Sequence, residues 1–497
     1  MKLKFFTLCA VLLLCSAPTF SQQIKGQIID AKNSEPVAFA TVQFDVDQGV
    51  VSNIEGYFAL SSTELTAESI LTISFMGYQT RNLTVKELQD LNNIVKLNES
   101  VNQLNTVYIT NKLPRVDSIM ARVNRNLKKN YPVSNVKHTL FSRETSFFNA
   151  NNLVVDIEKS SNFSKKQLES SNRQFKELTE QIVNNPPTQT FTDALLHLYQ
   201  KSDGNTKMEV EKATKLKDRK NSLSLETIQE KVTNIVLQHL DTTRTYKVKT
   251  GWFTVEDSMS LKKSKEEKKE TDDNSFISLK SDNVNAINEH LFEKQSIMDF
   301  VLDSDIYDYQ LTNVTTIDDQ MVYLIKFEPR KNRAKFKGTM YVADTDYAIL
   351  KVDYGFAEGK VGEKLNLKLL LGVKYVENVN KGTVIYKKNQ ENNSYYPYYI
   401  NHESSQYVYA HRPFKFIENN EDSKNKVAFD ATIEGNVVEK YELMSLDFKQ
   451  LDTTIIDGVT EAKKVEYVQL KQYDPTIWKD YSIMEPLEEL KKFKVEE

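Results

Sequence analysis

The residues whose spacing most clearly suggests chemistry are His290 and Glu293. A His-x-x-Glu pair can supply two ligands to zinc, and His402 or His411 could provide a third. Catalytic zinc also needs a general base and side chains that orient its ligands, and the sequence marks neither around these residues. The alternative of a zinc metallopeptidase is therefore disfavoured. We predict no catalytic, cofactor-binding or metal-binding residue and no cofactor.

Two further clusters invite a chemical interpretation. The first consists of Asp299, Asp303, Asp305 and Asp308. Calcium loops also need a glycine at the turn and a closing glutamate at a fixed offset, which are missing here, so a solvated acidic loop is expected. The second consists of Tyr395, Tyr396, Tyr398, Tyr399, Tyr407 and Tyr409. Aromatic platforms bind sugars, but alternating tyrosines on a sheet more often pack, and packing is the favoured interpretation.

Composition narrows the function classes. The chain has 497 residues with 65 basic and 69 acidic side chains, a net charge of -4. This balance argues against a nucleic-acid partner. The length predicts two to four domains, and neither a glycine-rich phosphate loop nor a nucleophile elbow is present. The sequence therefore predicts a protein that is not an enzyme.

Residues 1–21 have the pattern of a secretion signal. Lys2 and Lys4 precede an apolar stretch too short to span a membrane, and small residues favour cleavage before Gln22. Both cysteines, Cys9 and Cys15, lie inside this segment, so the mature chain is expected to contain no thiol and no disulfide. We expect an exported protein, periplasmic or associated with the outer membrane or cell surface. No later segment is apolar for long enough to form a transmembrane helix.

Residues 22–110 are predicted to form a seven-stranded β-sandwich. Short apolar runs between Gly26 and Leu97 are separated by turn residues, and Gly56 closes a tight turn that favours a positive φ. The stretches GQIIDAKNSEPVAFATVQF, SNIEGYFAL and LTISFMGYQTRNL resemble the carboxypeptidase-regulatory-like domain, a transthyretin-like (prealbumin-like) sandwich. The resemblance implies a non-catalytic module of outer-membrane and secreted proteins of Gram-negative bacteria. The resemblance implies a structural role, and no catalytic one, for six residues: Gly26, Pro36, Gly56, Phe58, Gly77 and Tyr78.

This resemblance also disfavours the zinc hypothesis, because in the carboxypeptidases the module follows the catalytic domain, whereas here it comes first.

After the module, residues 111–245 are predicted to be a helical or mixed segment. Helical spacing marks residues 114–129 and 224–240, and residues 191–199 are expected to form a short helix. The segments NYP and FSRE are similar to uncharacterised envelope proteins that carry the same module.

Residues 246–475 are predicted to be an antiparallel β domain with a charged loop at 262–274. Alternating apolar residues predict strands at 321–327, 336–342 and 348–356, and one unbroken strand at 365–375. The stretch YLIKFEPRKNRAKFKGTMYVADTDYAILKVDYGF resembles strands of periplasmic lipoprotein carriers, which implies a curved half-barrel as one form of the sheet. Residues 476–497 are expected to form a helical cap.

The sequence thus predicts a mainly β protein with some helix: a small sandwich, a helical middle segment and a large antiparallel sheet. The favoured function is an exported, non-enzymatic envelope protein with an interaction or scaffold module. An alternative is a lipid- or glycan-binding protein that uses the C-terminal sheet. The partner is an unidentified envelope protein, lipid or glycan.

Overall fold

A computed structural model describes most of the chain after the first 22 residues. The described residues are 23–45, 48–61, 65–100, 114–185, 187, 189–217, 240–241, 243–251, 253–260, 275–294, 296–317, 320–420 and 425–495. The predicted secretion signal, the charged loop at 262–274 and nearly all of the helix predicted at 224–240 lie outside these residues.

The chain divides into two compact units. The first comprises Met1–Glu99 together with Asp474–Leu487, and the second comprises Ser100–Tyr473 together with Glu488–Glu497. Residues 476–497, predicted as one helical cap, are therefore shared between the two units. The reason is that Trp478, Ile483 and Met484 are buried in the first unit, whereas Leu490 joins a core cluster of the second.

The first unit is a two-sheet sandwich. One sheet has the order β4-β1-β7 and the other β3-β2-β5-β6, with β1 and β7 parallel. The strands are β1 (Ile24–Asp30), β2 (Thr41–Gln43), β3 (Gly49–Val51), β4 (Tyr57–Leu60), β5 (Ile70–Ser74), β6 (Arg81–Thr84) and β7 (Ile94–Leu97), with helix α2 at Val85–Asp90. Both sheets bury their inner residues, so the predicted seven-stranded sandwich is confirmed.

The residues singled out in the module contact one another. Gly56 has φ +77°, and a Cβ there would lie 2.5 Å from the carbonyl oxygen of Ile28, so glycine is required at this turn. Gly26 faces the ring of Phe58 across β1 and β4, with no room for a side chain. The Tyr78 hydroxyl donates to Asp30 at 2.8 Å. These contacts explain why the module needs small and aromatic residues at those positions.

The segment 474–487 completes the first unit. It contains the 3₁₀ turn η3 (Pro475–Trp478). The side-chain amide of Asn53, which is 2% exposed, donates to the carbonyl oxygen of Glu485 at 3.1 Å. Lys25 forms an ion pair with the Glu485 carboxylate at 3.0 Å, and the Ser61 amide donates to the Ser482 hydroxyl. These hydrogen bonds join residues more than 400 positions apart in the chain.

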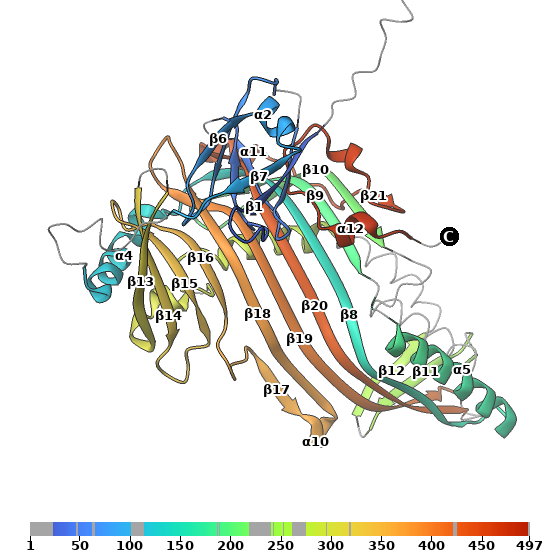
Figure 1. Cartoon of the computed structure of the whole chain (residues 1–497). Helices are drawn as coiled ribbons and strands as arrows, with labels where there is room; N and C mark the ends of the chain where they lie inside the picture. The colour runs from blue at the N-terminus through green and yellow to red at the C-terminus, as the bar shows by residue number, and fades with distance from the viewer. Residues whose placement is uncertain are drawn as a thin grey trace, which may run out of the picture. The chain divides into compact units, whose positions relative to one another are not determined.

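The second unit is built on one open, mainly antiparallel sheet, which in the described residues contains fourteen strands (Figure 1). Its main order is β13-β14-β15-β16-β18-β19-β20-β8-β9-β10-β21; β17 pairs with β18, and the β11–β12 hairpin pairs with β19. The strands are β8 (Val136–Ser160), β9 (Thr190–Gln200), β10 (Thr206–Lys217), β11 (Thr245–Thr250), β12 (Phe253–Ser260), β13 (Tyr307–Ile317), β14 (Gln320–Pro329), β15 (Phe336–Ala343), β16 (Ile349–Phe356), β17 (Lys364–Leu367), β18 (Val373–Lys388), β19 (Tyr395–Glu418), β20 (Lys426–Gln450) and β21 (Tyr467–Leu470). The predicted large antiparallel sheet is confirmed.

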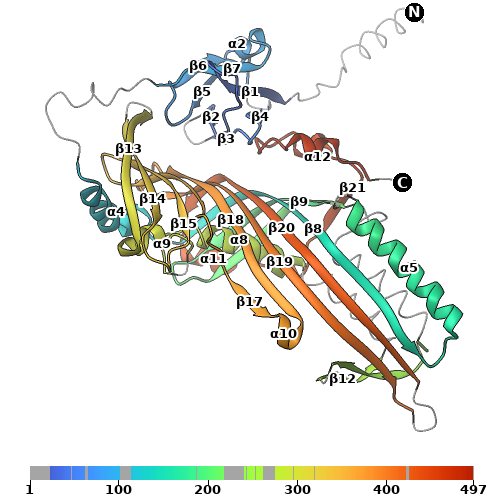
Figure 2. The same cartoon turned by 60° about the horizontal axis from the view of Figure 1, so that its bottom comes forward.

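Helices cover parts of this sheet. They are α4 (Val116–Asn130), α5 (Lys165–Asn184), α8 (Ser275–Asn288), α9 (Asp299–Leu302), η2 (Ser304–Ile306), α10 (Lys368–Leu371), α11 (Thr453–Gly458) and α12 (Glu488–Lys492). Helix α4 confirms the helix predicted at 114–129. Helix α5 runs beside β8, and α8 lies against one face of the central strands (Figure 2).

Two local predictions were wrong. Residues 191–199 form β9 and not a helix, because pairing with β8 on one edge and β10 on the other outweighs local helix propensity. The predicted strand at 365–375 is interrupted by α10 and by Gly372, which has φ +64°. In the described part of the middle segment, which was predicted to be helical or mixed, β8, β9 and β10 belong to the large sheet.

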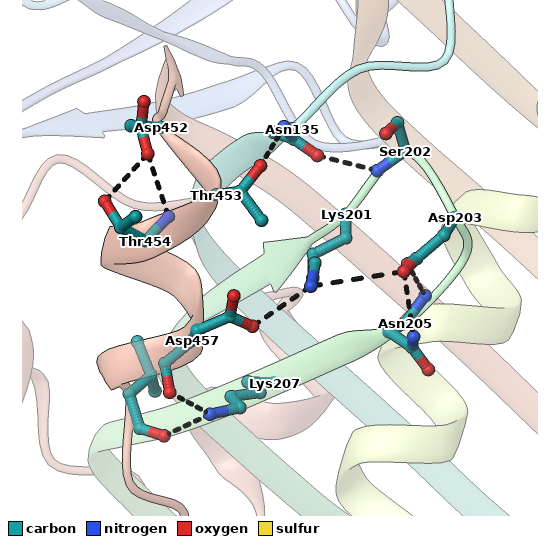
Figure 3. Close-up of polar contacts among 11 residues, drawn as sticks. Asn135, Lys201, Ser202, Asp203, Asn205, Lys207, Asp452, Thr453, Thr454 and Asp457 are labelled. Atoms are coloured by element: carbon teal, nitrogen blue, oxygen red, sulfur yellow. Dashed lines mark hydrogen bonds and ion pairs between the residues drawn. The ribbon is translucent and has the colours of Figure 1, made fainter.

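A polar cluster ties α11 to the β9–β10 turn (Figure 3). Lys201 donates to Asp457 at 3.0 Å, and Lys207 donates to the carbonyl oxygens of Asp457 and Val459 at 2.7 Å each. Asn135 accepts from the Ser202 amide at 2.8 Å. These contacts satisfy helix-terminal and turn groups, so their role is structural. Among the residues that the structure describes, no helix is long and apolar enough to cross a membrane.

Candidate functional site

The two residues of the zinc hypothesis lie in different surroundings. His290 is fully buried and both ring nitrogens have protein partners: Nδ1 lies 2.7 Å from the Ala286 carbonyl oxygen and Nε2 lies 2.8 Å from the Tyr354 hydroxyl. A carbonyl only accepts, so Nδ1 donates and Nε2 accepts the tyrosine proton. Burial, reinforced by His402, lowers the pKa of His290 to about 3, which keeps the ring neutral. Glu293 is exposed.

The possible third ligands do not complete a metal site. The ring of His402 is 5.9 Å from that of His290, centroid to centroid, but the His290 nitrogens are already occupied. His411 lies nine residues further along β19, roughly 30 Å away at about 3.3 Å per residue. In the part of the chain that the structure describes, no group of three or more His, Cys, Asp or Glu residues could hold a metal ion.

The acidic cluster near β13 is tied to basic residues and tyrosines. Asp303 pairs with Arg333 at 2.9 Å, and Asp305 pairs with Lys331 at 2.7 Å. The Asp299 carboxylate accepts from a tyrosine hydroxyl, that of Tyr307, at 2.9 Å. This pairing explains the cluster without a bound cation.

The tyrosine cluster is mostly part of the core, as its packing interpretation predicts. Tyr395, Tyr396, Tyr398 and Tyr399 are all buried. Tyr396 stacks on Phe448 with ring centroids 4.1 Å apart, and Tyr399 donates to Glu442 at 3.0 Å.

The feature with the strongest chemical character is a cavity of about 680 Å³ between α8 and the central strands. We call it the acidic cavity. Its lining carries six carboxylates, from Glu144, Asp282, Glu289, Glu363, Glu377 and Glu439, against one ammonium, that of Lys335. Asn285, Asn380, His402, Ser404, Gln406 and Tyr441 add polar groups.

Strand register brings the sheet residues of the acidic cavity together. Glu144 on β8 stands opposite Tyr441 on β20, which stands opposite His402 on β19. The neighbouring row contains Glu439 opposite Ser404, and both rows face the same side of the sheet because side chains alternate with a period of two. Helix α8 supplies the remaining wall.

The α8 side of the acidic cavity also follows from local structure. Asp282, Asn285 and Glu289 recur at intervals of three and four residues, so they lie on one face of the helix and its continuation. Between these positions Asn283 and Ile287 are buried against the protein. The helix therefore packs with one face and presents carboxylates with the adjacent one.

Burial and mutual repulsion raise the pKa values of several carboxyl groups in the acidic cavity. Burial, followed by the charges of Asp282 and Glu439, raises the pKa of Glu144 to about 7. Asp282 is partly exposed on α8, and its partial desolvation together with the charge of Glu439 raises its pKa to about 6. Burial and Glu377 raise the pKa of Glu289. Carboxyl groups with raised pKa values gathered in one cavity are typical of functional sites.

Glu377 is held in place by its neighbours. One carboxylate oxygen accepts from the Asn380 side chain at 2.9 Å, and the other accepts from the Glu363 amide at 3.1 Å. A Cβ at Gly362 would overlap the Glu377 carboxylate, so any larger residue there would push this carboxylate out of its present position. This carboxylate is therefore positioned before any ligand arrives.

A second cavity, of about 370 Å³, lies where the ends of α4 and α8 meet β8, β19 and β20. We call it the aromatic pocket, and its ring-bearing lining residues are Tyr131, His138, Phe292, Tyr395, Tyr396 and Phe448. Tyr131 packs on Phe292 with centroids 4.5 Å apart and donates its hydroxyl to the Ile349 carbonyl oxygen at 2.6 Å. Burial lowers the pKa of His138 to about 4, so this wall is uncharged.

Sequence reasoning missed the acidic cavity. Its carboxylates are spread from residue 144 to residue 439, and no local spacing relates them. Glu144 is the last residue of the FSRE segment, and nothing in that segment indicates a ligand site. The one local clue is the spacing of Asp282 and Glu289, which is common on solvated helix faces.

Comparisons with known proteins bear on the N-terminal module. Residues 24–109 match a family model described as the CarboxypepD_reg-like domain, which confirms the prediction for the N-terminal module. No curated protein matches the chain. A solved structure of a LolA superfamily protein from Nitrosomonas europaea is 9% identical and covers 69% of this chain and 98% of its own. Its TM-score of 0.21 is too low to support a structural argument.

Proposed function

We propose that this is an exported, non-enzymatic protein of the cell envelope that binds an organic cation in the acidic cavity of its sheet unit. The CarboxypepD_reg-like domain at residues 24–109 suggests a scaffold or interaction module. The observation that supports cation binding is the excess of six lining carboxylates over one lysine. An amine or guanidinium ligand can donate hydrogen bonds to several carboxylates at once and relieve their repulsion.

The same electrostatics weigh against two other ligand classes. An anionic ligand would meet like charge on most walls of the acidic cavity. An acyl chain would displace water from carboxylates such as Glu144 and Glu439 without replacing their hydrogen bonds, which is costly. A cation of two charges fits a cavity of about 680 Å³ with opposed acidic walls.

Calorimetry with putrescine and with agmatine, both of which keep two positive charges up to pH 8, tests this proposal, with succinate as an anionic control. We expect both cations to bind, and the affinity to rise between pH 5 and pH 8 because Glu144 and Asp282 lose their protons there. Glu439→Gln should weaken binding about tenfold, the effect of one charged hydrogen bond. The exposed residue Glu358 provides the matched control, Glu358→Gln, which should leave affinity unchanged.

Failure of both cations to bind at pH 8, or equal affinity of the Glu439→Gln protein, would contradict cation binding. Turnover of peptides, esters or glycans that is lost in Glu144→Gln would contradict the non-enzymatic assignment. The two parts of the proposal can therefore fail separately.

The aromatic pocket supports a second candidate, the binding of a flat apolar or sugar ligand. Its rings surround about 370 Å³, and Lys128, Gln200 and Asn288 provide polar groups at its edge. Stacking faces combined with edge hydrogen bonds are typical of such sites. A glycan array or native mass spectrometry tests this candidate. Binding should be lost in Phe448→Ala and retained in Glu439→Gln.

A further inference from the structure

The β17–α10–β18 connection exposes leucines that a folded protein normally buries. Leu369 and Leu370 in α10 are 102% and 83% exposed, and Leu365 in β17 is 49% exposed. Single exposed leucines are common, but three within six residues form a cluster. In both views α10 lies at the free end of the β17–β18 hairpin (Figures 1 and 2).

A second exposed apolar segment lies beside this one. The His411 amide on β19 donates to the Gly372 carbonyl oxygen at 2.8 Å, just after α10. Two residues further along β19, the Pro413 carbonyl oxygen accepts from the Gly251 amide at 3.3 Å, in the turn between β11 and β12. The two turns are therefore neighbours on β19.

The β12 strand adds two exposed apolar side chains at the same end of the sheet. Phe253 is 59% exposed and Val255 is 63% exposed. We define the apolar tip as the set Leu365, Leu369, Leu370, Phe253 and Val255.

Basic side chains outnumber acidic ones around the apolar tip, although Asp430 and Glu434 lie on the neighbouring part of β20. Lys364, Lys368 and Lys374 lie within or beside it, and residues 364–376 contain no acidic side chain. Arg412 and Lys415 follow on the adjacent part of β19, and Lys249 lies on β11. On β12, Asp257 is already paired with Lys247 at 2.7 Å, and Glu256 is the other acidic side chain. The chain carries a net negative charge, so this basic region differs from the average surface.

Two of these lysines lie over tyrosine rings. The Lys368 ammonium lies 3.9 Å from the ring centroid of Tyr409, and the Lys374 ammonium lies 5.2 Å from that of Tyr407. Exposed leucines next to lysines and tyrosines are the side-chain types found where a protein enters the boundary between lipid headgroups and acyl chains.

We propose that the apolar tip docks on a lipid bilayer that contains anionic lipids. A bilayer suits this surface better than a protein groove, because the leucines protrude into solvent from a turn. The flanking lysines and arginine would be attracted to lipid phosphates, while the leucines enter the interface. This inference is independent of the ligand of the acidic cavity.

Vesicle co-sedimentation tests the proposal with the full chain lacking residues 1–21. We expect binding to vesicles of phosphatidylcholine mixed with phosphatidylglycerol, much weaker binding to pure phosphatidylcholine, and release at high salt. The double variant Leu369→Ser/Leu370→Ser should weaken binding at least tenfold. Ile455→Ser, at an exposed isoleucine of α11, is the matched control and should bind normally.

Two additional measurements keep the test decisive. Circular dichroism should show both variants folded, since the replaced side chains are exposed. A tryptophan introduced by Leu369→Trp should shift its emission to shorter wavelength when anionic vesicles are added. The proposal would be overturned if the protein did not bind the vesicles that contain phosphatidylglycerol, or if the double variant bound them as well as the unchanged protein. A change in oligomeric state in the double variant would also overturn it, because the tip would then contact a second copy of the chain.

Discussion

At the scale of single residues, Glu144 makes the acidic cavity sensitive to pH. Its pKa is about 7 in the folded protein, against an ordinary value of 4.5. Below pH 4.5 both states hold the proton, so the group contributes nothing. Between pH 4.5 and 7 the unfolded chain loses the proton first, and stability falls as pH rises. Above pH 7 the loss is complete, at most about 3 kcal/mol.

Glu144→Gln should therefore raise the free energy of unfolding at pH 8 by about 1–3 kcal/mol and leave it unchanged at pH 4. Urea unfolding at the two pH values measures the difference. Glu358→Gln, at an exposed site, should show no such pH dependence. Equal effects of Glu144→Gln on the free energy of unfolding at both pH values would show that folding does not raise the pKa of this carboxyl group.

Gly56 allows a prediction for the first unit. Gly56→Ala places a Cβ in a left-handed backbone conformation and against the Ile28 carbonyl oxygen, so we expect a loss of about 2 kcal/mol or more. Gly77 shares the positive φ but has open space around it, so Gly77→Ala should cost only about 1 kcal/mol. Thermal unfolding of the unit measures both. An equal loss of stability in the two variants would show that contact with the Ile28 carbonyl oxygen is not what makes Gly56→Ala more costly.

At the scale of elements, α5 packs on the sheet through two buried apolar side chains, Phe175 and Ile182. Phe175 is fully buried and shares a core cluster with Val155 and Ile157 of β8. Phe175→Ala should lower the free energy of unfolding by about 3–5 kcal/mol, because a large cavity replaces the ring. Lys176→Ala, on the exposed side of the same helix, is the control. Hydrogen exchange of α5 amides gives a local measurement, and unchanged protection in Phe175→Ala would contradict the assignment.

At the scale of the whole molecule, the division into two units predicts two unfolding transitions. Trp478 is fully buried in the first unit although it lies near the end of the chain. With Trp252→Phe as background, Trp478 is the one remaining tryptophan, and its fluorescence should follow the first unit alone. Deleting residues 474–487 removes that buried ring and the partners of Asn53, and should lower this transition while leaving the other in place. Calorimetry measures the deletion variant, because the fluorescent ring is lost, and an unchanged pair of transitions would contradict the prediction.

Local patterns predicted the elements that local interactions form. The turn at Gly56, the strands of the module, the hairpins between residues 321 and 356 and helix α4 follow from turn chemistry and from apolar spacing. The prediction failed at residues 191–199, where two neighbouring strands impose an extended conformation on a helix-compatible stretch. It also failed at 365–375, where alternation continues through residues that leave the sheet.

The acidic cavity could not be predicted in this way. Glu144 and Glu439 become neighbours through the register of β8 with β20, which depends on pairing between strands about 300 residues apart. Asp282 then faces them because α8 packs on that side of the sheet. A carboxylate looks the same in the sequence whether it stands alone on the surface or lies beside other carboxylates in one cavity.

By itself, the sequence determined the class of the N-terminal module, the mainly β character of the chain and the position of most strands. These depend on interactions between residues a few positions apart, which a single sequence records directly. Only the tertiary structure decided that residues 474–487 complete the first unit, that six carboxylates share one cavity, and that leucines 369 and 370 protrude from the sheet. Those features depend on which distant segments pack together and on which surfaces that packing leaves uncovered.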